Sequence, residues 1–169
     1  NNLVTKVQNM VMKDYHVYAA MRYGKPSLRE ILRNIQKNQP EQIIVFPLYP
    51  QYASSTTGSV NELIFNEIKK WNVIPEIRFV GQFYSHPLYI DVIAGKIKSY
   101  NESGFDHILF SYHGLPLKHI KKIHQEENIA DCECNIKLPA GATFCYKATC
   151  YETSRLIAEK LELSTEKYS

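Results

Sequence analysis

The sequence has no long hydrophobic run. No stretch of about 18 apolar residues occurs anywhere in the chain, and a helix needs about that length to cross a membrane. A charged segment followed by an apolar one, which would mark a secretory leader, is also missing from the beginning. We therefore expect no membrane-spanning helix and a cytoplasmic protein.

An excess of charge of one sign is missing as well. The formal net charge is only +3 and the basic residues are scattered, which argues against nucleic acid as a partner. Neither an internal repeat nor a low-complexity segment is visible. Apolar residues make up 44% of the 169 and charged residues 22%, as is usual for a globular chain that buries its own core.

Cysteine is confined to one short stretch near the C-terminal end. The spacing is C-x-C-x₁₀-C-x₄-C, and its four members are Cys132, Cys134, Cys145 and Cys150. Without a secretory signal such cysteines are expected as thiols or metal ligands rather than disulfides. Four thiolates can hold a [2Fe-2S] cluster or a structural zinc ion, and unliganded cysteines are the third alternative.

Buried strands and helices alternate along the chain. Apolar runs predict strands over residues 15–21, 42–47, 75–80 and 106–110, and periodic segments predict helices over residues 1–13, 27–37, 59–71, 88–100, 117–124 and 149–163. Ser27 with Glu30 and Ser59 with Glu62 form capping boxes at two helix starts. This alternation predicts an α/β fold with a doubly wound parallel sheet.

The strand over residues 106–110 leads to His113, with Gly114 and Pro116 behind it. In an open parallel sheet, ligands bind beyond the carboxyl ends of the strands. We expect the loops after the strands to open on one edge of the sheet, and these loops are residues 22–26, 48–58, 82–87 and 111–116. An imidazole at that edge can transfer a proton or bind a metal, although it can also simply cap a loop.

Four phrases of the sequence resemble ferrochelatase, in the order and spacing of that family. They are Met21-Arg-Tyr-Gly-Lys-Pro26, Tyr49-Pro-Gln-Tyr-Ala-Ser-Ser-Thr-Thr-Gly-Ser59, Ser111-Tyr-His-Gly-Leu-Pro116 and the run CYETSRLIAE from Cys150 to Glu159. The resemblance implies a chelatase-like fold and a lyase that inserts ferrous iron into protoporphyrin IX to give protohaem, the last step of haem biosynthesis.

The resemblance also implies that this chain is a middle fragment. The family's chains are roughly twice as long, as two similar α/β lobes require. Residues 1–116 would form a first lobe that lacks its N-terminal part, and residues 117–169 would hold a linking helix, the cysteine segment and the start of a second lobe. The segment with the family's essential glutamate is not in this sequence, so we expect the isolated fragment to be inactive.

The site residues follow from the same phrases. His113 matches the family's active-site histidine, and whether it acts as base, Fe²⁺ ligand or both stays open. Arg22 can pair with a propionate and Tyr23 can pack on the macrocycle. The remaining matches to substrate-binding positions are Tyr49, Tyr52, Thr56, Thr57 and His86, the last with a structural role equally open. Ser59 is expected to cap a helix, and His119 and His124 to face solvent.

Some bacterial ferrochelatases carry four cysteines in an internal segment that ligates a [2Fe-2S] cluster. The resemblance therefore favours the cluster for Cys132, Cys134, Cys145 and Cys150. Its role would be structural or regulatory, because metal insertion transfers no electrons.

Two other functions stay open. One is a chelatase that inserts cobalt or nickel into a different tetrapyrrole, against which the Tyr-Pro-Gln-Tyr phrase argues. The other is a porphyrin-binding, haem-binding or Fe-S-binding domain without catalysis. The expected partners are protoporphyrin IX and ferrous iron, and peripheral contact with the inner membrane and the oligomeric state are left open.

Overall fold

The computed structural model describes residues 2–100, 104–123, 133–138 and 143–169. Its regular elements are α1 (Asn2–Met10), α2 (Leu28–Lys37), β1 (Gln42–Val45), the π-helical turn η1 (Ser54–Gly58), α3 (Ser59–Ile68), β2 (Glu76–Phe79), α4 (Pro87–Ser99), α5 (Leu117–Lys121), the 3₁₀ turn η3 (Glu133–Asn135), α6 (Tyr146–Lys160) and the 3₁₀ turn η4 (Thr165–Lys167). None of the helices in this part of the chain has the length and apolar content that a bilayer crossing requires.

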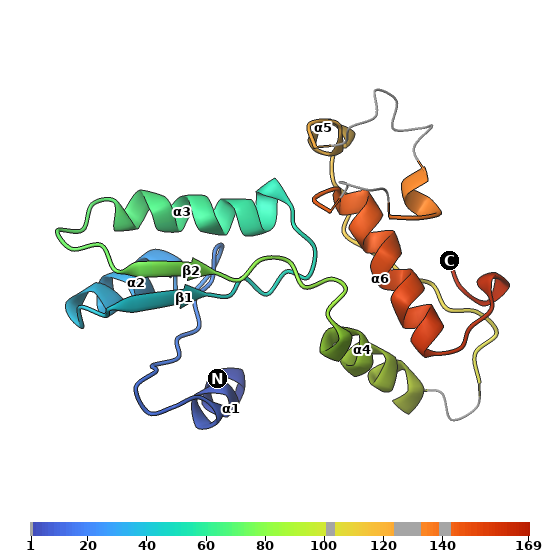
Figure 1. The fold of residues 1–169 in the computed structure, drawn as a ribbon, viewed down its shortest axis with the longest axis horizontal. Helices are drawn as coiled ribbons and strands as arrows, with labels where there is room; N and C mark the ends of the chain where they lie inside the picture. Colours follow the sequence, from blue (N-terminus) through green and yellow to red (C-terminus); the bar gives the residue numbers. More distant parts are fainter. Residues whose placement is uncertain (1, 101–103, 124–132, 139–142) are drawn as a thin grey trace. The chain divides into compact units, whose positions relative to one another are not determined.

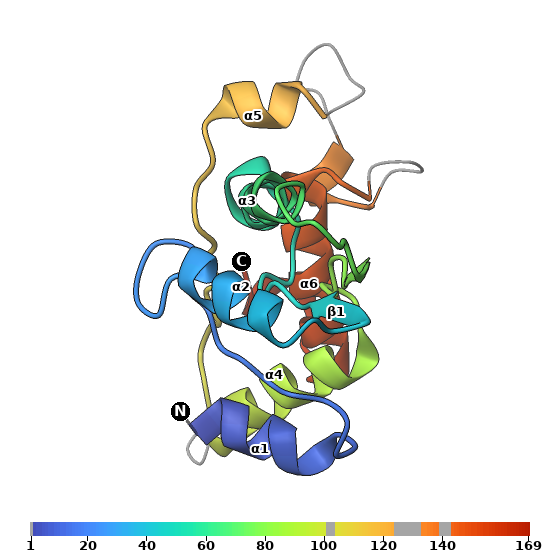
Figure 2. The ribbon, with the colours of Figure 1, turned by 90° about the vertical axis from the view of Figure 1, so that its left-hand side faces the viewer.

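The chain divides into two compact units. Unit 1 consists of residues 1–47 and 55–80, and unit 2 of residues 48–54 and 81–169. In unit 1, β1 and β2 pair in parallel, with Gln42 opposite Glu76 and Val45 opposite Phe79. Helix α3 connects the two strands, and α2 and α3 pack on the same face of this sheet (Figures 1 and 2). The parallel sheet with its helices confirms the expected α/β fold.

The core of unit 1 is made by the inward side chains of these elements. Leu32 of α2, Ile43 of β1 and Ile64 and Ile68 of α3 are almost completely buried. Strand residues alternate between this core and the open face, where Ile44 is half exposed. The apolar run over residues 42–47 thus predicts β1, although the strand has one exposed side and ends at Val45.

The two capping boxes have different outcomes. Ser27 caps α2 as predicted, because its hydroxyl accepts a hydrogen bond of 3.2 Å from the Glu30 backbone N–H. At Ser59 the prediction is wrong: the N-cap of α3 is Gly58, without a side-chain cap bond. The Ser59 hydroxyl instead accepts a hydrogen bond from the Arg22 guanidinium, and a charged donor makes a stronger bond than a neutral amide.

Two predicted strands do not form in the described residues. Residues 15–21 are irregular, except for one bridge between Met21 and Ser27, and the segment that leads to His113 has only the bridge between Ile108 and Tyr168. Leu109, expected in a central strand, is 75% exposed. An apolar run becomes a strand only where a neighbouring segment supplies hydrogen-bond partners along its length. Within the described residues, the segment before His113 is paired by backbone hydrogen bonds of Ile108 and Phe110 to residues 167–169 alone, which is too short a partner for a regular strand.

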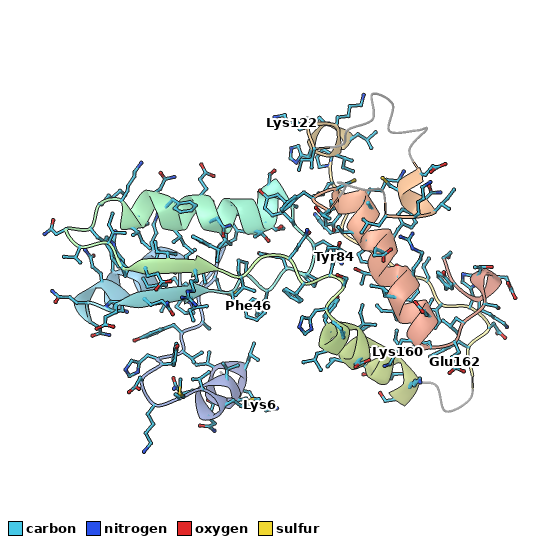
Figure 3. All side chains as sticks on the ribbon, viewed as in Figure 1. Lys6, Phe46, Tyr84, Lys122, Lys160 and Glu162 are labelled. Carbon is cyan, nitrogen blue, oxygen red and sulfur yellow. The ribbon has the colours of Figure 1, made fainter. Side chains whose placement is uncertain are left out.

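In unit 2, α4 packs against α6 (Figure 1). Ile90 and Ala94 of α4 and Ile157 and Ala158 of α6 are buried. Tyr84, labelled in Figure 3, precedes α4 and is 7% exposed. Helix α6 begins three residues earlier than expected, directly after Cys145, and therefore includes the C-terminal part of the cysteine segment.

Candidate active site

His113 lies on the connection between Phe110 and α5, in unit 2. Its imidazole is exposed and has no hydrogen-bond partner among the described residues. The preceding residue, Tyr112, is half-buried, and its hydroxyl lies 3.0 Å from Ser154 Oγ of α6. The structure therefore fixes one residue of this loop to α6 and leaves the neighbouring imidazole accessible to a ligand.

Two adjacent hydroxyl residues on α6, Thr153 and Ser154, hold three of the predicted loops. Thr153 Oγ1 accepts a hydrogen bond of 2.9 Å from Gln51 Nε2 and lies 3.2 Å from the backbone oxygen of Tyr84. Ser154 contacts Tyr112. The loops that hold Gln51, Tyr84 and Tyr112 thus meet along one side of α6.

The sequence analysis did not assign roles to these α6 residues. Thr153 and Ser154 belong to the family-like run CYETSRLIAE, and they are 1% and 7% exposed. A pair of hydroxyl side chains within an otherwise buried helix segment could have indicated the contact, because buried hydroxyls need hydrogen-bond partners.

Arg22 and Tyr23 lie together in unit 1. Arg22 Nε donates hydrogen bonds to Ser59 Oγ at 2.8 Å and to Ser59 O at 3.3 Å. The Tyr23 hydroxyl lies 3.3 Å from the same Ser59 Oγ, and the guanidinium carbon of Arg22 is 4.6 Å from the centre of the Tyr23 ring. Tyr23 remains 74% exposed. Ser59 therefore orients a cation and an open aromatic ring, which suits a flat ligand with a carboxylate.

The two threonines of the hydroxyl-rich loop lie on the π-helical turn η1, which leads into α3. Thr56 is half-buried, and Thr57 is 4% exposed. The hydroxyl of Thr57 has no hydrogen-bond partner within the described residues. π-Helical turns are frequent at functional sites, and a buried hydroxyl without a partner calls for an explanation such as a ligand.

The tyrosines of the same loop belong to unit 2. Tyr49 is half-buried. The Tyr52 backbone N–H donates a hydrogen bond of 3.3 Å to Gln82 Oε1, and Gln82 Nε2 donates one to the backbone oxygen of Thr143. The Tyr52 ring meets Phe144 edge to face, with ring centres 5.5 Å apart. Tyr52 is thus held against the residues that precede Cys145.

The other histidines have structural surroundings. His86 is the N-cap of α4, where its Nδ1 accepts a hydrogen bond of 3.3 Å from the Leu88 N–H. His119 was expected to face solvent, and this is wrong: it lines a small pocket in unit 2 with Ser54 and Tyr146, and its buried Nδ1 has no partner among the residues described. His119 is half-buried. His124 lies outside the described residues.

Three of the four cysteines expected to hold a [2Fe-2S] cluster lie in the described part of unit 2. Cys134 of η3 and Cys145 are 0% and 1% exposed and pack together with Ala148. Cys150 follows on α6, and Cys132 lies outside the described residues. Burial raises the pKa of the Cys150 thiol to about 12. A bound metal has the opposite effect, because it favours the thiolate of a coordinating cysteine.

Within the described ranges, no three potential ligand side chains are gathered around one point. Three buried thiols in one unit, two of them in the same buried cluster, nevertheless supply the donor chemistry that a [2Fe-2S] cluster needs.

Comparisons with known proteins agree with the resemblance. The family model described as Ferrochelatase matches residues 1–169. A protein named Ferrochelatase from Legionella pneumophila (strain Philadelphia 1) is 36% identical over 175 residues, which cover 99% of this chain and 49% of the relative. The Ferrochelatase of Coxiella burnetii (strain RSA 493) is 41% identical over 157 residues, which cover 92% of this chain and 43% of the relative. The chain thus spans about half the length of the curated relatives it matches.

Proposed function

The chain belongs to the ferrochelatase family, and from this premise we propose that it is part of a lyase that inserts ferrous iron into protoporphyrin IX in haem biosynthesis. The observation on which the proposal depends is the exposure of the His113 side chain on a loop that is fixed beside it. Its loop is tied to α6 through Tyr112, while the imidazole stays exposed without a partner in the described structure. Such an imidazole can accept a pyrrole proton or bind Fe²⁺.

The roles of the other residues follow from their chemistry. In unit 1, Arg22 would pair with a propionate carboxylate, Tyr23 would pack on the macrocycle, and the unpartnered hydroxyl of Thr57 would donate a hydrogen bond to the substrate. In unit 2, Tyr49 and Tyr52 would contact the porphyrin. Thr56 and His86 stay predicted substrate-binding residues, although the cap bond of His86 supports a structural role.

The proposal includes a [2Fe-2S] cluster held by Cys132, Cys134, Cys145 and Cys150. The buried cluster that Cys134 and Cys145 share with Ala148 at the beginning of α6 supports it. Bound thiolates would link η3 to α6 and stabilise the segment on which Phe144 meets Tyr52. Zinc on the same thiols is the alternative.

The organisation of the whole protein is also part of the proposal. We expect residues 1–116 to belong to a first lobe and residues 117–169 to begin a second. The second lobe would supply the glutamate partner of His113, so residues 1–169 alone would be inactive. A cytoplasmic location, with or without peripheral contact at the inner membrane, is expected for this enzyme.

The experiment that tests this function is an insertion assay with the full-length protein that carries this sequence. Protoporphyrin IX with Fe²⁺ should give protohaem, followed by its absorption spectrum, and Zn²⁺ should serve as a substitute ion. Turnover of Co²⁺ or Ni²⁺ with a reduced tetrapyrrole, in place of protoporphyrin, would identify the other class of chelatase. Binding of porphyrin without insertion would show a binding domain and overturn the proposal.

A further inference from the structure

Tyr112 and His113 are neighbours with opposite surroundings. Tyr112 is half-buried and reaches α6, whereas His113 is exposed. Consecutive Cα atoms lie about 3.8 Å apart. Any restraint on the Tyr112 side chain therefore also restrains the backbone from which the imidazole extends.

The contact between Tyr112 and α6 has a defined direction. The Ser154 hydroxyl donates to the backbone oxygen of Cys150, at 3.3 Å. When the single hydroxyl proton of Ser154 is used in that bond, the Tyr112 O–H donates in the 3.0 Å contact with Ser154 Oγ. Burial raises the pKa of Tyr112 to about 12, so the phenol keeps the proton that it donates.

Ser154 is a well-fixed acceptor. It is 7% exposed, and its neighbour Thr153 is held by Gln51 and by the backbone of Tyr84. Helix α6 also packs on α4. The Tyr112 hydroxyl therefore binds to a part of unit 2 that has contacts on several sides.

We propose that Tyr112 is a positioning residue for His113, which it holds in place by donating its phenolic hydrogen bond to Ser154 of α6. If the ring were needed only for packing, a phenylalanine at position 112 would do the same, because it fills nearly the same space. The hydroxyl adds a directional contact that fixes the loop over residues 111–116. The kinetic part of the test rests on the proposed function, and the spectroscopic part does not.

The test compares Tyr112→Phe with Tyr151→Phe in the full-length protein. Tyr151 lies on α6, the helix that Tyr112 contacts through Ser154, and is 44% exposed. Loss of one hydrogen bond that orients the imidazole should lower kcat about fivefold, with KM for porphyrin unchanged. Tyr151→Phe should leave both constants at their wild-type values.

A second variant and a second readout keep the test decisive. Ser154→Ala leaves the Tyr112 ring intact and should lower kcat by the same factor, and the double variant should lower it no further, because one contact is lost in all three. In NMR spectra the imidazole signals of His113 should shift or broaden in Tyr112→Phe and Ser154→Ala but not in Tyr151→Phe.

The outcomes separate the two proposals. Unchanged kcat together with unchanged His113 signals in both variants would overturn the positioning role. If the wild-type protein inserts no iron, the proposed function fails, and the NMR comparison alone then decides the role of Tyr112. If Tyr112→Phe does not fold, the comparison of Ser154→Ala with the wild type decides it.

Discussion

Gln51 and Thr153, 102 positions apart in the sequence, are joined by a hydrogen bond of 2.9 Å between Gln51 Nε2 and Thr153 Oγ1. Both side chains are buried, at 8% and 1% exposure. The bond ties the Tyr-Pro-Gln-Tyr phrase to α6. Since a buried amide that loses its partner is costly, the loop conformation depends on one hydroxyl group of a distant helix.

The first prediction concerns this bond. Thr153→Val keeps the shape but leaves the Gln51 amide without its acceptor, so it should lower the free energy of unfolding by about 1–3 kcal/mol. Thr149→Val is the matched control, because the Thr149 hydroxyl bonds only to carbonyls of its own first turn, Cys145 and Tyr146. Urea denaturation measures the free energy of unfolding of both variants. Equal decreases in the two would show that the bond to Gln51 adds no stability.

The second prediction concerns Arg22. Arg22→Lys keeps the charge but loses the planar group that contacts Ser59 and stacks on Tyr23. A loss of about 1 kcal/mol of binding free energy for protoporphyrin would raise its KM roughly fivefold, with little change in kcat. Arg33→Lys, on the exposed side of α2, should leave KM unchanged, and a similar KM for both variants would argue against a substrate contact.

The third prediction concerns the cysteine segment. If its thiolates hold a [2Fe-2S] cluster, the purified full-length protein should contain iron and absorb visible light, and Cys145→Ser should lose both. Metal analysis and absorption spectra measure this. Zinc without visible absorption would indicate the alternative metal, and iron and colour that persist in Cys145→Ser would exclude Cys145 as a ligand.

The fourth prediction is a dependence of stability on pH in the metal-free protein. Burial raises the pKa of Cys150, and those of Tyr112 and Tyr146, to about 12. The unfolded chain releases these protons at lower pH than the folded chain does, so the free energy of unfolding should fall as pH rises from about 9 towards 12. Denaturation curves at several pH values measure the decline, which should be shallower in Cys150→Ala. An identical decline in that variant would show that the thiol does not contribute.

The sequence predicts those features that depend on neighbouring residues. The cap at Ser27 forms because donor and acceptor are three residues apart. β1 and β2 form where apolar runs flank a helix, because that spacing suits a parallel crossover. The exposure of His113 also agrees with its place after an apolar segment, on a connection where Gly114 and Pro116 disfavour a strand.

The predictions that were wrong concern features that depend on residues far away in the sequence. Ser59 leaves its cap position because Arg22, 37 residues away, supplies a charged donor. The segment before His113 is apolar enough for a strand, but within the described residues its backbone pairs with residues 167–169 alone. An apolar pattern does not show which neighbour a segment will meet, or over what length. For the same reason the contacts of Thr153 and Ser154 with three loops could not be derived from the order of residues along α6.

The most direct test of the central claim is iron insertion by the full-length protein with His113→Ala, compared with His86→Ala. The two roles open for His86 predict different results for His86→Ala. A helix cap alone contributes about 0.5–2 kcal/mol of stability and its loss keeps the activity, whereas loss of a substrate contact raises KM for porphyrin and leaves kcat near its wild-type value. Loss of a residue that moves the pyrrole proton or binds the iron should lower kcat of His113→Ala by about 10²–10⁴-fold while the fold is kept. Wild-type activity in His113→Ala would contradict the account.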